Sequence, residues 1–231
     1  MLIVTGCSQN HLVPQLQMLR TVAEHEPDAD VWVYDLGGLD DDDRQAVREA
    51  CPRAAVRRFD YAQYPAYFDI TKNAGEYAWK ATILYAALRE RRGVVMWLDA
   101  GCNLVGPLDA VRAEVRRAGL YSPVSNGRIE HWTHPETSRR LHTPREDRAN
   151  VDNLSGGVVC ADWAHPVARQ LVCRWACLSA RKAVIAPRGS SRDNHRQDQA
   201  VLTGLVADAQ RAGRLAPDLV REMVNITVHN E

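Results

Sequence analysis

Asp99 directly follows a short apolar run, Val94–Leu98, and precedes two small residues, Ala100 and Gly101. An apolar run of this length behind a helical segment predicts a strand that is buried on both faces of a parallel sheet. Asp99 then lies at the carboxyl end of that strand, the edge where open α/β sheets bind ligands. Burying a carboxylate there costs free energy unless a cation or a hydrogen-bond donor meets it. The segment therefore predicts a ligand-facing strand end.

Other segments of the chain have the same character. Residues 5–10 and 153–157 each follow or end an apolar strand pattern with polar and small side chains. The densest polar stretch, residues 189–199, leads directly into an apolar helix pattern. Asp198 and Gln199 are therefore expected in the first turn of a helix, held rigidly near its positive end. The alternative for this stretch is a helix start behind a solvated loop.

The elements that position these segments alternate between strand and helix patterns. Strands are predicted at residues 2–6, 30–36, 54–59, 94–99, 103–105, 119–125, 154–160 and 183–186. Helices are predicted at residues 11–25, 40–51, 75–91, 107–118, 163–180 and 197–212. This order predicts an α/β fold, a mostly parallel sheet flanked by helices, in a single domain spanning residues 1–231. Neither a GxGxxG fingerprint nor a GxxxxGK[ST] phosphate loop is present.

The overall charge narrows the class of partner. Formal net charge is zero, from 29 basic and 29 acidic residues, which argues against nucleic-acid binding through phosphate attraction. A local basic patch around Arg139, Arg140, Arg145 and Arg148 is an alternative that the net charge does not exclude.

Residues 1–4 enter a strand without a basic leader, and no apolar run reaches the roughly 20 residues of a membrane span. We therefore expect a cytoplasmic protein with no membrane span.

Two clusters of metal-ligating residue types have simpler interpretations. Four consecutive acids, residues 40–43, open a predicted helix, where negative charge favours the positive helix end. Cys173 and Cys177 lie one helical turn apart in an apolar helix pattern, so we interpret them as small core residues rather than as a zinc site.

The four polar segments, taken in order, resemble the motifs of GT-A fold glycosyltransferases, and most of all glycosyltransferase family 8 and its bacterial relatives. That family has a nucleotide-binding first loop, a Leu-Asp-x-Asp strand end, an Asn-x-Gly segment and an Asp-Gln pair that begins a helix. The matching residues here are Thr5-Gly6-Cys7-Ser8-Gln9-Asn10-His11, Leu98-Asp99-Ala100-Gly101, Asn153-Leu154-Ser155-Gly156-Gly157 and Gln197-Asp198-Gln199-Ala200-Val201-Leu202. The resemblance covers residues 2–203, nearly the whole chain.

The resemblance implies transfer of a sugar, expected to be a hexose, from a nucleoside diphosphate sugar to an acceptor hydroxyl, with UDP as the expected nucleotide and with retention of configuration. It implies a nucleotide-binding half at about residues 1–105 and an acceptor-side half at about 106–231. Asp198 and Gln199 would support the oxocarbenium-like sugar or orient its hydroxyls. The donor would be bound by Thr5, Gly6, Ser8, Asn10, Asp99, Asn153, Gly156 and Gly157.

One departure from the family concerns the metal. Gly101 stands where the family has the second aspartate of its metal-binding motif, and manganese or magnesium prefer several hard oxygen ligands. The family also draws a histidine ligand from near its C-terminus, which only His229 could match, so Asp99 and His229 are the expected metal ligands. If the ion binds weakly, another cation must neutralise the diphosphate. Lys80, Arg192 and Arg196 are candidates.

The acceptor and two alternative functions stay open. Aromatic residues 61–68 and the polar residues 131–148 are the expected acceptor walls, because loops carry specificity. The former stretch could equally be an irregular packing loop. A non-catalytic nucleotide-sugar-binding scaffold is the first alternative, favoured by Gly101. A sugar nucleotidyltransferase is the second, although the first loop has no basic residue before His11.

Overall fold

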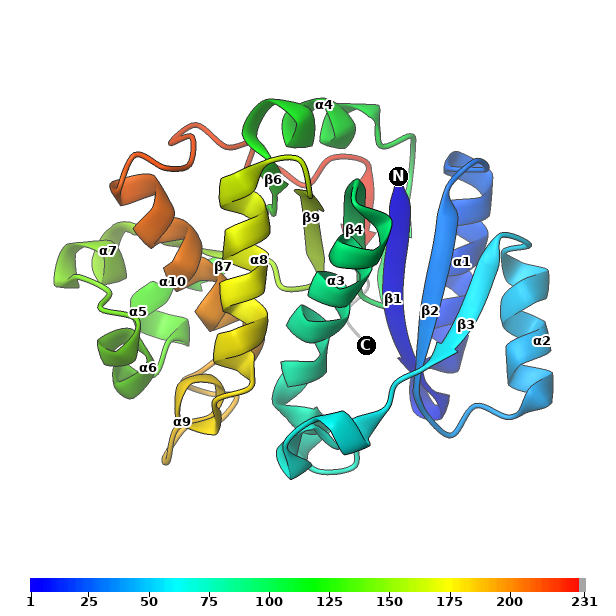
Figure 1. The fold of residues 1–231 in the computed structure, drawn as a ribbon, viewed down its shortest axis with the longest axis horizontal. Coiled ribbons are helices and arrows are strands. Elements are labelled where there is room, and N and C mark those ends of the chain that lie inside the picture. Colours follow the sequence, from blue (N-terminus) through cyan, green and yellow to red (C-terminus); the bar gives the residue numbers. More distant parts are fainter. Residues whose placement is uncertain (229–231) are drawn as a thin grey trace.

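A computed structural model of the chain describes residues 1–228 and shows a six-stranded sheet with helices on both faces (Figure 1). The strand order is β3-β2-β1-β4-β9-β6. The strands are β1 (Leu2–Ser8), β2 (Asp30–Gly37), β3 (Ala54–Arg58), β4 (Val94–Leu98), β6 (Leu120–Tyr121) and β9 (Val158–Asp162). Neighbours from β3 to β4 are parallel, whereas β9 is antiparallel to both β4 and β6. The predicted α/β architecture with a mostly parallel sheet is confirmed, with β9 as the exception.

Helices cover the two faces of this sheet in two sets. One set contains α1 (Leu12–His25), α2 (Asp41–Ala50) and α4 (Asp109–Ala118), and the other contains α3 (Ala78–Arg91), α8 (Pro166–Ser179) and α10 (Gln197–Arg211). Along β4, Val95 and Trp97 pack toward the second set, whereas Met96 and Leu98 pack toward the first. Because successive side chains of a strand point to opposite faces, an unbroken apolar run fits a strand covered on both sides. The double burial predicted for this strand is therefore confirmed.

Two short antiparallel pairs extend the structure beside the main sheet. One joins β5 (Cys102–Leu104) to β10 (Ile226–Val228), and the other joins β7 (Val124–Arg128) to β8 (Asp152–Leu154). The strands predicted at residues 119–125 and 154–160 are thus each divided between two pairings. Gly156 and Gly157 make the second division, because they turn the chain from β8 into β9.

Several local predictions were wrong. Residues 183–186 were expected to form a strand, but residues 183–185 belong to a short helix, α9 (Lys182–Ile185), since an apolar run of four residues fits either element. The segment 131–148, expected to be irregular, contains parts of three short helices, α5 (Ile129–Trp132), α6 (Pro135–Arg140) and α7 (Arg145–Asn150). Cys173 is only half-buried and Cys177 is exposed, so this pair lies toward the outer side of α8 and not in the core.

The acidic run of residues 40–43 begins α2, as predicted. Asp40 accepts a hydrogen bond from the Asp43 backbone N–H at 2.8 Å, and the Asp43 side chain accepts one from the Asp40 N–H at 3.2 Å. This reciprocal pair is a capping box, which satisfies backbone donors that the first helical turn leaves free.

The aromatic stretch after β3 both packs and lines a cleft. It forms short 3-10 turns at Tyr61–Gln63 and Ala66–Phe68. Tyr64 stacks between Phe59 and Phe68, with ring centroids 5.0 Å from each, and Phe68 is fully buried. Tyr61, from the same stretch, reaches the cleft described below. The packing interpretation therefore holds for Tyr64 and Phe68, whereas the acceptor role of this stretch stays a prediction.

A left-handed turn precedes α3. All five residues of Asn73–Tyr77 have positive φ, between 49° and 62°. For residues other than glycine this backbone region costs about 1–2 kcal/mol each. Such strain persists only where the surroundings hold it, and it clusters at functional sites.

Gly75, in the centre of this turn, is required by a close backbone contact. A Cβ atom at this position would overlap the carbonyl oxygen of Phe68 and lie 2.9 Å from the Trp79 ring. We expect Gly75→Ala to lower the free energy of unfolding by about 3 kcal/mol or more, because overpacking adds to left-handed strain. Urea unfolding measures this loss. Gly93→Ala is the matched control, since the nearest atom to its Cβ would lie 4.0 Å away. Equal stability of the two variants would contradict the role assigned to Gly75.

Candidate active site

A large cleft lies at the carboxyl ends of the parallel strands. Its volume is about 1730 Å³, larger than the roughly 300–1,000 Å³ of ordinary small-molecule pockets. Ser8 at the end of β1, Gly37 at the end of β2 and Asp99 directly after β4 all line it. This is the edge where the sequence predicted a ligand, and the cleft has room for an extended ligand with more than one part.

Lys80 occupies the centre of a polar cluster beneath this cleft. It comes from α3, is 4% exposed, and places Nζ 2.9 Å from Asp99 Oδ1 and 3.5 Å from Asp198 Oδ2. Nζ also donates to the carbonyl oxygen of Gly156 at 3.1 Å. Burial alone would lower the pKa of Lys80, but the carboxylates of Asp198 and Asp99 outweigh it and hold the pKa above its usual value. Lys80 is therefore an ammonium ion between two carboxylates.

Hydrogen bonds to neighbouring residues hold Asp99 in place. Trp97 Nε1 donates to Asp99 Oδ1 at 2.6 Å, and Lys80 Nζ donates to Oδ2 at 3.0 Å. The backbone N–H of Asp99 donates to the Gly157 carbonyl oxygen at 2.9 Å, which ties the strand end to the turn before β9. The side chain of Asp99 is nevertheless 41% exposed, so it is accessible from the cleft. Its carboxylate is thus oriented before any ligand binds.

Asp198 begins α10 and is almost completely buried, with 4% exposure. Trp175 Nε1 donates to its backbone carbonyl oxygen at 2.8 Å, and the preceding residue, Gln197, has a positive φ of 34°. Burial raises the pKa of Asp198 to about 6, Lys80 opposes this rise, and Asp99 adds to it. Within residues 1–228, Asp198 Oδ2 accepts no hydrogen bond. Asp198 can therefore change protonation state near neutral pH.

Gly156 and Gly157 each lie close to one of these two carboxylates. A Cβ at Gly156 would lie 3.0 Å from Asp198 Oδ2, and one at Gly157 would lie 2.9 Å from Asp99 Oδ2. Side chains at these positions would displace the carboxylates from Lys80. The glycine pair is therefore needed for the approach of the turn to the cluster.

Two amide side chains reach the cleft beside Asp198. The Thr203 hydroxyl lies 3.1 Å from Asn153 Oδ1, which orients this buried amide. Asn153 Nδ2 has no partner within the described part of the chain, and Asn153 and Gln199 both line the cleft. Asn153 thus retains a buried donor for a ligand, and unsatisfied buried donors are uncommon in native proteins.

The residues predicted after the first strand are divided by their burial. Gly6, Ser8 and Asn10 line the cleft, and the Ser8 hydroxyl donates to Asn10 Oδ1 at 2.5 Å. Thr5 does not line the cleft. It is fully buried, and its hydroxyl donates to Gln15 Oε1 of α1 at 3.0 Å. We therefore leave Thr5 out of the candidate site, because a side chain that faces α1 cannot contact a ligand in the cleft.

Two arginines reach the cleft from the loop before α10. Arg192 Nη2 donates to the Tyr77 hydroxyl at 2.8 Å, and the Arg196 guanidinium lies 4.3 Å from the Trp132 ring centroid. Arg192, Arg196, Tyr77 and Trp132 all line the cleft. Tyr61 from the first expected acceptor wall and Trp132 from the second thus line the same cleft.

Several positioning residues carry weak sequence signals or none. Trp97 stands two residues before Asp99, so strand alternation could have placed both on one face. Trp175, Tyr77 and the buried His195 have no such signal. The His195 ring accepts from the His134 backbone N–H at 3.2 Å and bonds the Ile185 carbonyl oxygen at 2.8 Å. Burial lowers the pKa of His195 to about 4, so this neutral ring anchors the loop that leads to Asp198.

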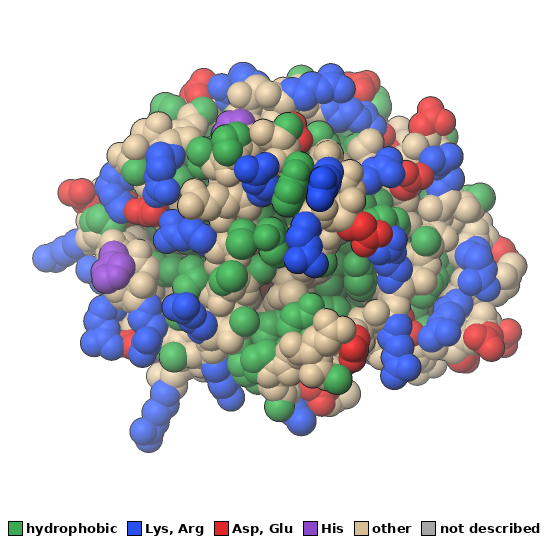
Figure 2. Space-filling view, in the orientation of Figure 1, with side chains coloured by type: hydrophobic (Ala, Val, Ile, Leu, Met, Phe, Trp, Pro, Cys, Tyr) green, Lys and Arg blue, Asp and Glu red, His purple; other side chains and the backbone are tan. Residues whose placement is uncertain are grey.

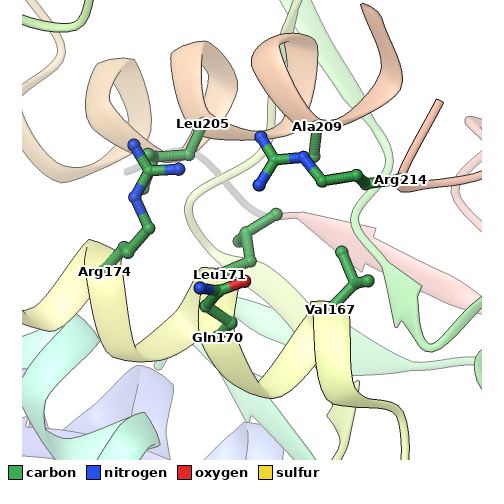
Figure 3. Close-up of a pocket in the computed structure, with 7 residues that line it drawn as sticks. All are labelled: Val167, Gln170, Leu171, Arg174, Leu205, Ala209 and Arg214. Atoms are coloured by element: carbon green, nitrogen blue, oxygen red, sulfur yellow. The ribbon is translucent and has the colours of Figure 1, made fainter. Parts of the chain in front are cut away.

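A much smaller depression, of about 10 Å³, lies between α8 and α10 (Figure 3). Arg174 and Arg214 flank it, and both pair with Asp208, at 3.5 and 2.9 Å. It has room for little more than one water molecule.

On the face of the molecule shown in Figure 2, basic side chains are dispersed over many elements. Arg139 and Arg140, from the predicted basic patch, both pair with Glu136.

Comparison with known proteins supports the fold. A family described as a protein of unknown function, DUF1647, matches residues 1–85, and no curated protein matches the chain. The galactosyltransferase LgtC, solved with donor and acceptor sugar analogs, is 15% identical with a TM-score of 0.61, covering 99% of this chain and 87% of its own. Core-mannan synthase A from Aspergillus fumigatus, in a Mn/GDP form, is 8% identical with a TM-score of 0.55, over 100% and 80%. Mouse xyloside xylosyltransferase 1 is 9% identical with a TM-score of 0.53, over 90% and 82%. This chain has the GT-A glycosyltransferase fold.

The resemblance to family 8 implies a divalent ion, but the described residues do not form a site for one. Within residues 1–228, no three His, Cys, Asp or Glu side chains are grouped to hold a metal ion. Both oxygens of Asp99 already accept hydrogen bonds, and Gly101 offers no side-chain ligand. His229, the other expected ligand, lies outside the described residues. Manganese and magnesium need several oxygen ligands, so Asp99 alone is a poor site.

In the part of the chain that the structure describes, no helix combines the length and the apolar composition that a membrane span requires.

Proposed function

We propose that this chain is a glycosyltransferase that moves a sugar from a nucleoside diphosphate sugar to an acceptor hydroxyl. The single observation that carries the proposal is the cluster at the sheet edge, in which Lys80 joins Asp99 to Asp198 beneath a large cleft. This cluster stands in a fold that LgtC, core-mannan synthase A and the xylosyltransferase share. Paired titratable groups with perturbed pKa values beside a large cleft are typical of active sites.

In the proposed reaction, the acceptor oxygen forms a bond to the anomeric carbon. The bond from that carbon to the β-phosphate oxygen breaks, its electron pair leaves with the nucleoside diphosphate, and the acceptor proton is released. Negative charge grows on the diphosphate and positive charge on the sugar. Asp198 and Gln199, at the start of α10, would support the oxocarbenium-like sugar or hold its hydroxyls. We propose a hexose donor carried by UDP and retention of configuration, from the resemblance to family 8.

The donor would lie across the ends of β1 and β4. Ser8 and Asn10 would contact the base and ribose, because both line the cleft after the first strand. Because Gly6 has no side chain, Leu36 and two tryptophan rings can pack closely against the strand at this position. A Cβ there would lie 2.9 Å from Leu36 Cδ1 and 3.2 Å from the rings of the two tryptophans. Asn153 would donate its free amide to the sugar or the phosphates. The acceptor would enter between Tyr61 and Trp132.

Ligand-dependent stability tests this proposal first. We expect one nucleoside diphosphate, among UDP, GDP, ADP and dTDP, to stabilise the protein by about 2.7 kcal/mol at a hundredfold excess over its Kd. The corresponding nucleotide sugar should then be hydrolysed slowly, and this is followed as nucleoside diphosphate release. If none of the four nucleotides stabilises the protein, the proposal that it acts on a nucleotide sugar is contradicted.

A non-catalytic scaffold is the second candidate, because Gly101 replaces a carboxylate that the resemblance leads us to expect. The same experiment separates the two functions. A scaffold would be stabilised by the nucleotide sugar but would release no nucleoside diphosphate, with or without added acceptor sugars. Measurable release, lost when Asp198 is changed, would exclude the scaffold.

A further inference from the structure

The charge balance around Asp99 leaves no positive charge for a diphosphate. Lys80 is shared between Asp99 and Asp198, and its Nζ lies within 3.5 Å of both. One ammonium group thus faces two carboxyl groups, which leaves the cluster without surplus positive charge. An incoming diphosphate carries further negative charge and would be repelled by this cluster. Donor binding therefore requires positive charge from elsewhere on the cleft.

Arg192 and Arg196 are positioned to provide that charge. Both are exposed and line the cleft, and among the described residues neither forms an ion pair with a carboxylate. Asp69, which also lines the cleft, pairs with Lys72 at 3.3 Å. The two guanidinium groups are therefore available to an anionic ligand.

The orientation of both arginines is fixed by aromatic side chains. Arg192 donates to the Tyr77 hydroxyl, and its guanidinium lies 5.6 Å from the Tyr77 ring centroid. The same centroid lies 5.7 Å from Lys80 Nζ, so Tyr77 connects the arginine to the carboxylate cluster. The Arg196 guanidinium lies 4.3 Å from the Trp132 ring centroid. Such stacking lowers the entropy that an arginine loses when it binds a ligand.

We propose that this chain binds the diphosphate of its donor without a divalent ion, and that Arg192 and Arg196 hold the phosphates in its place. This inference rests on the proposed function. Each guanidinium can donate two parallel hydrogen bonds to phosphate oxygens, and two of them match one negative charge on each phosphate of the donor. They also stabilise the charge that grows on the diphosphate as the bond to the sugar breaks. Asp99, the member of the Asp99–Lys80–Asp198 cluster that lines the cleft, then contacts the sugar rather than a metal ion.

Titration calorimetry of UDP, GDP, ADP and dTDP, each with excess EDTA and then with Mn²⁺, tests the proposal. We expect one nucleotide to bind with the same Kd in both conditions, within about threefold. Arg192→Ala and Arg196→Ala should each weaken binding in EDTA by about 10- to 100-fold, the range for hydrogen bonds to charged groups. Arg188→Ala is the matched control. Arg188 is exposed on the same loop but does not line the cleft, so its variant should bind as the unmodified protein does.

The outcomes separate this inference from the proposed function. Binding that requires Mn²⁺ would overturn the inference and leave the glycosyltransferase proposal standing. Metal-independent binding that is unchanged in both arginine variants would overturn the role of these side chains. No binding of any nucleotide in either condition would overturn the proposed function and this inference together. Circular dichroism of each variant confirms that it is folded, so weaker binding reports the lost charge.

Discussion

Lys80→Met should destabilise the protein by about 3–5 kcal/mol at pH 8, because it leaves two carboxylates without their cation. Lys80 is buried, and its Nζ contacts Asp99, Asp198 and the Gly156 carbonyl oxygen. Removing one member of a buried ion cluster leaves the remaining charges uncompensated. Nucleotide-sugar hydrolysis should fall by at least about 100-fold, because Asp99 and Asp198 lose their positions. Urea unfolding and the hydrolysis assay measure the two effects.

The loss of stability in Lys80→Met should be smaller at pH 5 than at pH 8. Without the ammonium group, the pKa of Asp198 rises above its present value of about 6, so the carboxyl is protonated at pH 5 and carries no buried charge. The double variant Lys80→Met/Asp198→Asn should recover part of the stability at pH 8. Lys80→Arg keeps the charge and serves as the control. An equal loss at both pH values would contradict the electrostatic explanation.

Asp198→Asn should lower the rate of nucleotide-sugar hydrolysis by about 100- to 1,000-fold, the effect of losing one well-placed electrostatic group. The amide has nearly the same shape but no negative charge to support the sugar. Asp193→Asn is the matched control, because Asp193 is an exposed carboxylate on the preceding loop outside the cleft. An Asp198→Asn variant as active as the Asp193→Asn variant would remove Asp198 from the proposed reaction.

The same variant should change how stability depends on pH. The folded-state pKa of Asp198, about 6, lies above the usual value of 3.8, so the folded state binds more protons between these two pH values. The contribution of Asp198 to stability therefore falls as pH rises from about 4 to 6, by about 3 kcal/mol in total. A side-chain amide does not titrate, so the free energy of unfolding of Asp198→Asn, relative to the unmodified protein, should rise across this window. A constant difference would show that the pKa is not raised.

Much of the local structure could be predicted because it depends on short-range patterns. The apolar run Val94–Leu98 predicts a strand buried on both sides, and the acids after Gly38 predict the capped start of α2. Residues 183–186 were misassigned for the same reason. Four apolar residues satisfy a strand and a helical turn equally well, and only packing against α6, α8 and α10 selects the helix.

The side chains that point into the cleft could be predicted only in part. Ser8 and Thr5 belong to the same strand, but odd and even positions face opposite sides of the sheet. Thr5 bonds Gln15 of α1, whereas Ser8 lines the cleft. The packing of the helices on the sheet decides which side chains of the strand reach the ligand. The sequence of a strand that is buried on both faces does not show this.

By itself, the sequence determined the α/β fold, the position of Asp99 at a strand end, and the position of Asp198 at the start of a helix. Only the tertiary structure decided that Lys80 lies between these two carboxylates, and that Trp175 and Tyr77 hold the surrounding groups. Lys80 and the Gly156 carbonyl oxygen that it contacts are 76 residues apart, and Tyr77 and Arg192 are 115 apart. Sequence periodicity reports the environment of neighbouring residues. It carries no distance between residues so far apart, because that distance is set by how strands and helices pack.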